Sequence, residues 1–166
     1  MKPNRKQNRC KYHDYSRPGA YFVTICTKER RHYFGEIETQ QTADNVGATV
    51  PGRPHMKFSK IGKCVENAIK YYNQMDNGIM FEHYVVMPNH IHAIIALYPA
   101  GDRGRSPLQY VVRNLKSYVT KNIGFSPWQT SYHDHVIRNR KTYEIIANYI
   151  RTNPKTWEND CYNTNS

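Results

Sequence analysis

The sequence predicts an α+β fold, with helices packed on one side of a mostly antiparallel sheet of about four to five strands. Short apolar runs rich in β-branched and aromatic residues alternate with stretches whose apolar residues recur at helical spacing. Along the chain these patterns follow the order strand, strand, helix, strand, strand, helix, strand, helix. The 166 residues show no internal repeat and are enough for one domain with a substantial core, so a single domain over residues 1–166 is expected.

The first third of the chain predicts an arm, two strands and a loop. Residues 1–19 are basic and polar, as expected of an arm that is either mobile or lies along a phosphate backbone. Residues 20–27, AYFVTICT, are apolar at nearly every position and predict a central strand, with residues 33–37 as its short hairpin partner. Residues 38–55 contain Gly, Pro, Thr and Asn without apolar periodicity, so a loop insertion is expected there.

The rest of the chain predicts three amphipathic helices and three further strands. Pro107 opens the second helix and Pro154 follows the end of the third, while Pro88 and Asn89 divide a long apolar run into two strands joined by a tight turn. The expected helices are residues 59–75, 107–123 and 142–153, the expected strands are residues 81–87, 90–98 and 128–138, and residues 161–166 are expected to be a polar tail.

The charge balance indicates a polyanionic partner. The chain has 24 Lys plus Arg against 13 Asp plus Glu and a net charge of +11. It also has 14 tyrosines, so a basic surface with interleaved flat side chains is expected, and such surfaces favour unpaired bases. Nucleic acid is the expected partner, although a basic balance can also serve solubility alone.

The cysteines and the lengths of the apolar runs predict the compartment. Cys10, Cys26, Cys64 and Cys161 form no C-x-x-C pair, so neither a zinc knuckle nor a redox motif is expected, and free thiols fit a reducing cytosol. No apolar run reaches membrane-spanning length, and no apolar stretch follows the basic N-terminus. We expect a cytoplasmic protein without a membrane partner.

His90 and His92 flank Ile91 within the apolar run of residues 80–98. Alternate residues of a strand share a face, so both imidazoles are expected to point to one side while Ile91 points into a core. Two neutral imidazoles on a rigid strand can bind a metal ion and leave coordination positions open. The alternative is two polar residues on the solvated face of a half-buried strand.

Three stretches of the chain resemble a known family. Residues 12–27 (YHDYSRPGAYFVTICT), 84–94 (YVVMPNHIHAI) and 148–157 (NYIRTNPKTW) are similar to the small single-tyrosine transposases of the HUH superfamily. Within this insertion-sequence-200-like group, they resemble the transposase-like proteins associated with REP palindromes, over about residues 11–160. The resemblance implies a ferredoxin-like fold, a divalent metal held by two histidines, and a tyrosine on a helix that attacks a phosphate of single-stranded DNA.

The resemblance assigns roles to four residues. His90 and His92 fall on the metal pair, Tyr149 falls on the nucleophile, and Asn153 falls where many relatives have Gln as a third ligand. Tyr149 and Asn153 are one helical turn apart, which suits a nucleophile beside a metal ligand, but they could also be core filling and a helix cap. Two His nitrogens and an amide oxygen leave about three octahedral positions open, so Mg²⁺ or Mn²⁺ is expected.

The resemblance implies a metal-dependent single-strand DNA endonuclease and strand transferase, or transposase, that acts next to DNA hairpins through a 5′ phosphotyrosine. Such a transesterification conserves bond energy, and the sequence has no P-loop for a nucleotide cofactor. Two alternatives are a non-catalytic module that binds hairpin DNA or RNA, and a phosphodiesterase with water as nucleophile. Some relatives exchange the tyrosine helix between subunits, so a monomer and a homodimer hinged at residues 122–128 are both open.

Other side chains are further candidates. Tyr118, among basic residues of the second helix, is a rival nucleophile or a DNA contact. His133 and His135 could line the metal site, touch DNA or face solvent, and His83 is expected to be structural. The basic residues from which DNA contacts are expected are Arg5, Arg9, Lys11, Arg17, Lys28, Arg30, Arg31, Arg113, Lys116, Lys121, Arg138 and Arg140.

Overall fold

A four-stranded antiparallel sheet forms the centre of the protein in the computed structural model, which describes residues 18–43, 49–75, 78–98 and 108–163. Its strands lie in the order β4-β5-β1-β6. Along the chain, the elements are β1 (Gly19–Cys26), η1 (Lys28–Arg30), β2 (Gly35–Ala43), β3 (Thr49–Phe58), α1 (Lys60–Gln74), β4 (Ile79–Met87), β5 (His90–Leu97), α2 (Leu108–Ile123), β6 (His133–Ile137), α3 (Arg140–Thr152) and η2 (Asn153–Asn159).

The fold class is confirmed. Apart from the β2–β3 hairpin, the chain runs β1, α1, β4, β5, α2, β6, which is the β-α-β-β-α-β arrangement of ferredoxin-like folds. The helices begin and end within two residues of the predicted positions. The last strand is shorter than predicted: only His133–Ile137 belongs to the sheet, and Trp128 forms an isolated bridge with Thr27.

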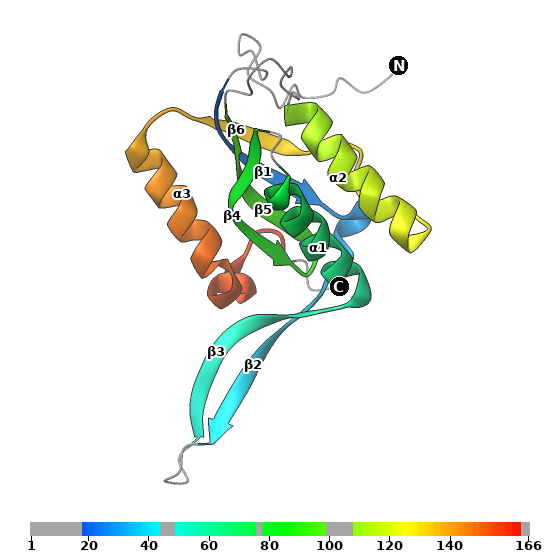
Figure 1. Cartoon of the computed structure of the whole chain (residues 1–166). Helices are drawn as coiled ribbons and strands as arrows, with labels where there is room; N and C mark the ends of the chain where they lie inside the picture. The colour runs from blue at the N-terminus through cyan, green and yellow to red at the C-terminus, as the bar shows by residue number, and fades with distance from the viewer. Residues whose placement is uncertain (1–17, 44–48, 76–77, 99–107, 164–166) are drawn as a thin grey trace, which may run out of the picture.

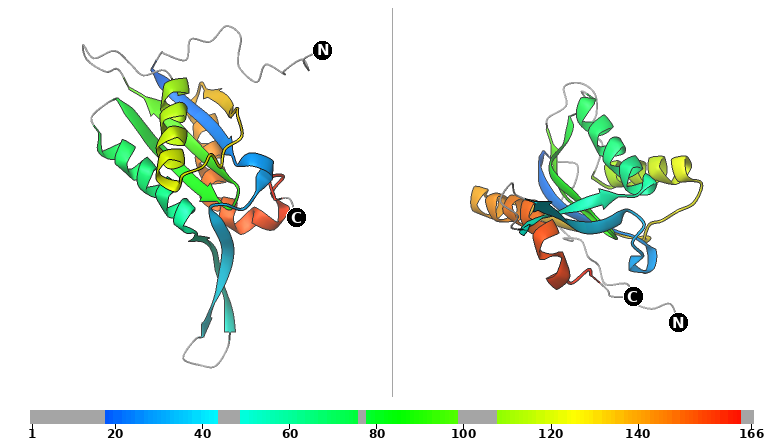
Figure 2. Two further views of the ribbon diagram at one scale, coloured as in Figure 1. Left: turned by 90° about the vertical axis from the view of Figure 1, so that its right-hand side faces the viewer. Right: turned by 90° about the horizontal axis from the view of Figure 1, so that it is seen from below.

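The sheet separates two helical layers. Helices α1 and α2 lie against one face and α3 lies against the other (Figures 1 and 2). The larger core joins β1 residues such as Val23 to Leu115 of α2, and the smaller core joins Ile94 of β5 to Ile150 of α3. The prediction that all helices pack on one side is therefore wrong for the third helix. Every residue of β5 is buried, which is what a strand covered on both faces requires.

The segment predicted as a loop insertion, residues 38–55, is instead most of a β-hairpin. Strands β2 and β3 pair antiparallel from Gly35 with Phe58 to Ala43 with Thr49, with a register shift between Thr39 and Gln41. The ribbon extends away from the body of the domain (Figure 1). Only the base of the ribbon packs on the core, through Met56 and Phe58, so the part that extends beyond the body needs no alternating apolar pattern and its sequence lacks the usual strand signal. The prediction that residues 33–37 pair with β1 is also wrong, because Gly35–Ile37 belong to β2, which pairs with β3.

The hairpin is attached to the body through the start of α1. The Ser59 side chain caps α1 by accepting a hydrogen bond from Gly62 N, and its hydroxyl donates to Tyr33 O at 2.6 Å. Gly62 packs so closely on the hairpin base that an added Cβ would lie 2.0 Å from Phe34 O. This helix turn therefore needs glycine for space. Among the helices that the structure describes, none has both the length and the apolar character of a transmembrane span.

Candidate functional site

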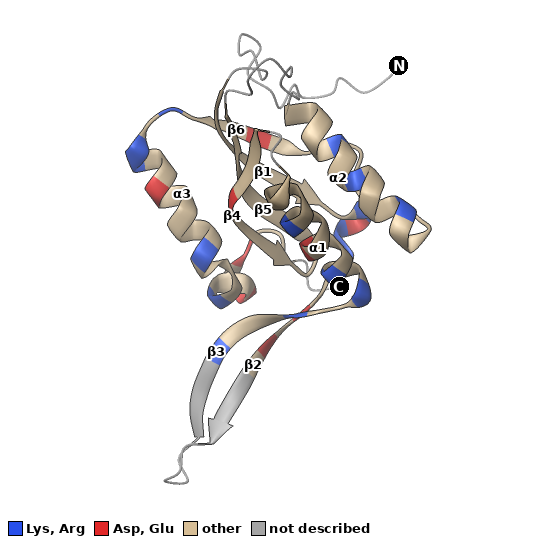
Figure 3. Ribbon diagram, in the orientation of Figure 1, with Lys and Arg blue, Asp and Glu red and all other residues tan. Residues whose placement is uncertain are grey.

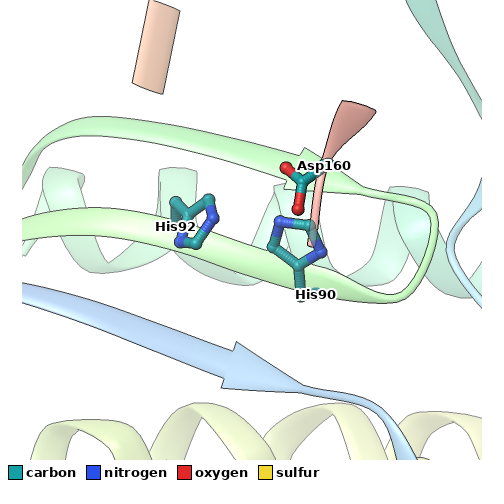
Figure 4. A group of neighbouring side chains, drawn as sticks. All are labelled: His90, His92 and Asp160. Atoms are coloured by element: carbon teal, nitrogen blue, oxygen red, sulfur yellow. The ribbon is translucent and has the colours of Figure 1, made fainter. Parts of the chain in front are cut away.

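The histidine pair lies on the central strand β5, on the face that α3 covers. Cys26 and Thr24 of β1 lie opposite His90 and His92 in the sheet. The two imidazoles are 0% and 1% exposed and their ring centroids are 4.4 Å apart (Figure 4). The alternative of a solvated strand face is wrong, because both rings are buried. Burial of two polar rings is costly unless their nitrogens have partners.

Asn89 fixes the orientation and tautomer of His90. Its side-chain amide nitrogen donates to the carbonyls of Arg30 and Tyr162, so its oxygen is the atom 2.9 Å from His90 Nδ1. His90 Nδ1 therefore donates the hydrogen, and Nε2 carries the lone pair. This Nε2 is buried and has no hydrogen-bond partner among the described residues. An unpartnered, buried lone pair held by an outer amide is the arrangement of a metal-ligating histidine.

Asp160 is the acidic member of this site. One carboxylate oxygen and one nitrogen from each of His90 and His92 lie within 4.8 Å of one another, a group that could hold a metal ion (Figure 4). The carboxylate is positioned by the backbone N–H of Tyr162, at 2.7 Å, and by the side-chain N–H of Asn153, at 2.9 Å. Asn153 Oδ1 is also buried without a partner among the described residues. The donor set thus contains imidazole, carboxylate and amide groups, which suit a divalent cation.

Helix α3 brings Tyr149 to the same place. Its hydroxyl lies 3.2 Å from His92 Nε2, and its ring packs edge-on against Phe22 with centroids 6.3 Å apart. The side chain is 38% exposed, so the hydroxyl is held by the site while the ring reaches the surface. Burial, followed by the nearby Asp160, raises the pKa of Tyr149 to about 12, and a hydrogen bond from Asn153 acts in the opposite direction. The phenol is therefore protonated at neutral pH.

Comparisons with known proteins indicate one family, although no model of a protein family matches the chain. An uncharacterized protein of Haemophilus influenzae is 31% identical over 95% of this chain and 92% of its own length. The REP-associated tyrosine transposase of Escherichia coli is 38% identical over 72 residues, which cover only 41% of its length. The solved structure of a REP-associated tyrosine transposase bound to a REP hairpin matches with a TM-score of 0.57 and 25% identity, over 88% of this chain and 73% of that one. In sequence and in fold, the chain is similar to the REP-associated tyrosine transposases.

The end of this transposase-like protein covers the histidine pair. The centroids of the Tyr162 and His90 rings lie 4.6 Å apart. The Arg30 guanidinium lies over the Tyr162 ring, with its Cζ 4.3 Å from the ring centroid. The polar tail predicted from Cys161 onward thus begins as part of the site, and residues 164–166 lie outside the described residues.

Arg30 and Glu29 both have positive φ, 57° and 55°, in a turn that Asn89 holds by donating a hydrogen bond to the Arg30 carbonyl.

The basic residues predicted to contact DNA divide into three groups, apart from Arg30, which lies over the Tyr162 ring. Arg5, Arg9, Lys11 and Arg17 lie outside the described residues. Lys28, Arg113, Lys121 and Arg138 are exposed, as are Arg31 and Arg140, which pair with Glu29 and Glu144 at 2.8 Å. Lys116 is different, because its ammonium donates to the carbonyls of Gln129 and Ser131, and burial lowers its pKa to about 8. Lys116 holds the segment before β6, so Arg30 and the exposed group are better candidates for phosphate contacts.

The rival side chains of the transposase-like protein lie away from the group formed by His90, His92 and Asp160. Tyr118 is on α2, behind the sheet from His92. His133 and His135 lie on β6 opposite Thr24 and Phe22, on the same face as the site but exposed. His83 packs against Tyr143, with ring centroids 5.7 Å apart.

The buried histidines make the metal-free protein sensitive to acid. Burial lowers the pKa of His90 to about 2 and that of His92 to about 4, whereas both return to 6.5 in the unfolded chain. The unfolded state therefore binds more protons below pH 6.5, and the free energy of unfolding should fall with decreasing pH, by about 1.4 kcal/mol per pH unit for each histidine. Urea unfolding at a series of pH values measures this slope.

One variant isolates the contribution of His92 to this slope. His92→Leu should lose about one proton's share of the pH dependence, because leucine binds no proton in either state. An identical slope in native protein and His92→Leu would contradict the burial of a neutral His92.

Proposed function

We propose that this protein is a metal-dependent single-strand DNA endonuclease and strand transferase that acts next to DNA hairpins through a 5′ phosphotyrosine intermediate. One observation carries the proposal: the Tyr149 hydroxyl lies 3.2 Å from Nε2 of the buried His92, within a group of donors that could hold a cation. The hairpin substrate is supported by the related transposase, which is bound to a REP hairpin in its solved structure.

His90, His92 and Asp160 are the residues that would hold the cation, with the amide oxygen of Asn153 as a further ligand. Nitrogen and oxygen donors without a thiolate favour Mg²⁺ or Mn²⁺, and Mn²⁺ accepts imidazole more readily. A bound cation would withdraw charge from the scissile phosphate and favour the phenolate, which a tyrosine with a pKa of about 12 requires.

In the proposed reaction, the Tyr149 oxygen attacks phosphorus and forms a phosphotyrosine bond to the 5′ phosphate of the strand downstream of the cut. The bond from phosphorus to the 3′ oxygen breaks, and that oxygen leaves as a 3′ hydroxyl after gaining a proton. The phenol proton must depart as the attack proceeds, and it passes to solvent water, because Tyr149 is 38% exposed and the Nε2 lone pair of His92 is the one that would hold the cation. Attack by a 3′ hydroxyl on the phosphotyrosine reverses these changes and joins strands.

One chain contains every member of the proposed site. Helix α3 places Tyr149 over the His90–His92 pair of the same chain, and the segment 122–128 is held to the body by the hydrogen bond from Trp128 Nε1 to Lys116 O and by the Thr27 bridge. We therefore propose that the nucleophile serves its own chain's histidines, as a monomer allows. A homodimer with exchanged helices would need this segment to detach.

The polarity of the covalent product tests the proposal. A hairpin oligonucleotide with a single-stranded flank is labelled at its 5′ end in one sample and at its 3′ end in another, then incubated with protein and Mn²⁺. The 3′ label should stay with the protein and the 5′ label should appear on a shorter strand with a free 3′ hydroxyl. Cleavage without any adduct would indicate water as nucleophile, and tight binding without cleavage would indicate a non-catalytic hairpin-binding module. Either result would contradict the proposal.

A further inference from the structure

A hollow of about 430 Å³ lies between α1 and α2, on the face of the sheet opposite the histidines. Four tyrosines line it: Tyr71 and Tyr72 from α1, and Tyr110 and Tyr118 from α2. We call this hollow the tyrosine groove. Figure 2 shows the two helices side by side on this face, with α3 on the other side of the sheet. The tyrosine groove is therefore separate from Tyr149.

The rings of the tyrosine groove are unusually exposed for a helix pair that packs on a core. Tyr71 is 55% exposed, Tyr110 is 52% exposed and Tyr118 is 44% exposed, and the adjoining Met75 is 43% exposed. The core beneath is already closed by Val111 of α2 and its apolar neighbours. These rings therefore add little to folding, and a cluster of exposed apolar side chains around a hollow indicates a binding surface.

The charges around the tyrosine groove are positive. Lys121 is the one ionic side chain among its lining residues. Helix α2 also carries Arg113 and no acidic residue, while the single acid of α1, Glu66, is paired with Lys70 at 3.0 Å. Figure 3 shows basic residues on the middle and later turns of α2. Both helices thus present net positive charge, which complements a polyanion.

Polar groups between the rings add hydrogen-bonding capacity. Asn114 and Ser117 of α2 line the tyrosine groove. Asn114 lies one turn from both Tyr110 and Tyr118, and Ser117 lies next to Tyr118 along the helix. An amide and a hydroxyl can each donate to or accept from the edges of a base. An acidic peptide would satisfy the charges of this surface but would leave its flat rings without stacking partners. Flat rings, interspersed amides and flanking cations together match a strand of unpaired nucleotides.

We propose that the tyrosine groove is a second nucleic-acid site, which binds the bases of single-stranded DNA by stacking on Tyr71, Tyr110 and Tyr118. Lys121 and Arg113 contact the phosphates on either side of the stacked bases. This site does not depend on Tyr149 or on a metal ion. It lets the protein bind unpaired nucleotides on the face of the sheet opposite Tyr149 and the histidine pair.

The test compares ring removal with ring retention, in a Tyr149→Phe background so that cleavage cannot consume the probe. Tyr71→Leu/Tyr118→Leu keeps apolar side chains but removes the flat rings. It should weaken binding of a fluorescent oligothymidylate of about 15 nucleotides by about tenfold or more, whereas Tyr71→Phe/Tyr118→Phe should stay within about twofold of the parent. Fluorescence anisotropy gives both affinities without a metal ion, and thermal melting checks that each variant is folded.

Photochemical crosslinking locates the bound strand. A single-stranded probe containing 5-iodouracil should crosslink to peptides from α1 and α2, and these crosslinks should be lost in the leucine pair. Equal affinity of the leucine and phenylalanine pairs, or crosslinks confined to α3 and β6, would overturn the second site. A leucine pair that binds the probe normally but no longer self-associates in sedimentation would instead make this groove an interface between copies, and would also overturn it.

Discussion

Tyr149→Phe should abolish the covalent protein–DNA adduct while the protein remains folded and still binds hairpin DNA. The Tyr149 hydroxyl is the phenol that lies within 3.2 Å of His92 Nε2, so its loss removes the proposed nucleophile and not a structural contact. The phenylalanine ring can keep the edge-on packing with Phe22. Loss of a nucleophile typically costs a thousandfold or more, so adduct formation should fall by at least about a thousandfold. Denaturing gels of labelled hairpin oligonucleotide measure the adduct.

Tyr143→Phe is the matched control, because it removes a hydroxyl from another tyrosine of the same helix. The Tyr143 hydroxyl donates to Glu82 at 2.7 Å and not to His90 or His92. This variant should form the adduct at close to the native rate. An undiminished adduct in Tyr149→Phe would show that another residue attacks.

His92→Ala should remove both Mn²⁺ binding and strand cleavage. Its imidazole lies between the Thr24 hydroxyl, 2.9 Å from Nδ1, and the Tyr149 hydroxyl, so it connects the sheet to the nucleophile. Changes to the outer partners of metal ligands typically cost about 10–100-fold, so losing a direct ligand should cost at least about a hundredfold in cleavage rate. Titration calorimetry with Mn²⁺ measures the binding, and the adduct assay measures the rate.

His135→Gln provides the control for the histidine substitution. His135 is exposed on β6 and does not belong to the group around Asp160, so Mn²⁺ binding should be unchanged. Native Mn²⁺ affinity in His92→Ala would place the cation elsewhere and would remove the basis for the proposed mechanism.

The local features of the site could be predicted from sequence because they depend on short-range periodicity. The two-residue period of a strand puts His90 and His92 on one face, and the helical period puts Tyr149 and Asn153 one turn apart. The resemblance to the family then predicted that these faces meet. The structure brings Tyr149 and His92 together, and Asn153 reaches the site through Asp160.

Asp160 could not be predicted, because its place depends on a chain reversal that leaves no periodic signal. The 3-10 turns of η2 after Asn153 and Pro154 bring the chain back over the histidines, so that Asp160 N donates to Trp157 O and Tyr162 covers His90. The spacing of candidate ligands along the sequence does not reveal Asp160, because this residue is far from His92 in sequence and follows an irregular turn.

Two architectural features were also hidden in the sequence, for different physical reasons. Most of the β2–β3 ribbon extends away from the body of the domain, where no core imposes an apolar alternation, and its prolines and glycines indicated a loop. The side on which α3 packs could not be read from α3, because an amphipathic stripe shows that a helix is buried but not which face of the sheet buries it. Strand β5 is more informative about the packing of the helices, because a strand that is buried along its whole length must be covered on both faces of the sheet.

Anomalous diffraction at the manganese absorption edge, from crystals grown with Mn²⁺, tests the central claim most directly. We expect a single strong peak bonded to His90 Nε2 and His92 Nε2, on the side of these rings that faces Asp160 and the Tyr149 hydroxyl. A peak at any other place, or none at the histidines despite full occupancy elsewhere, would contradict a metal-dependent nuclease site at this position.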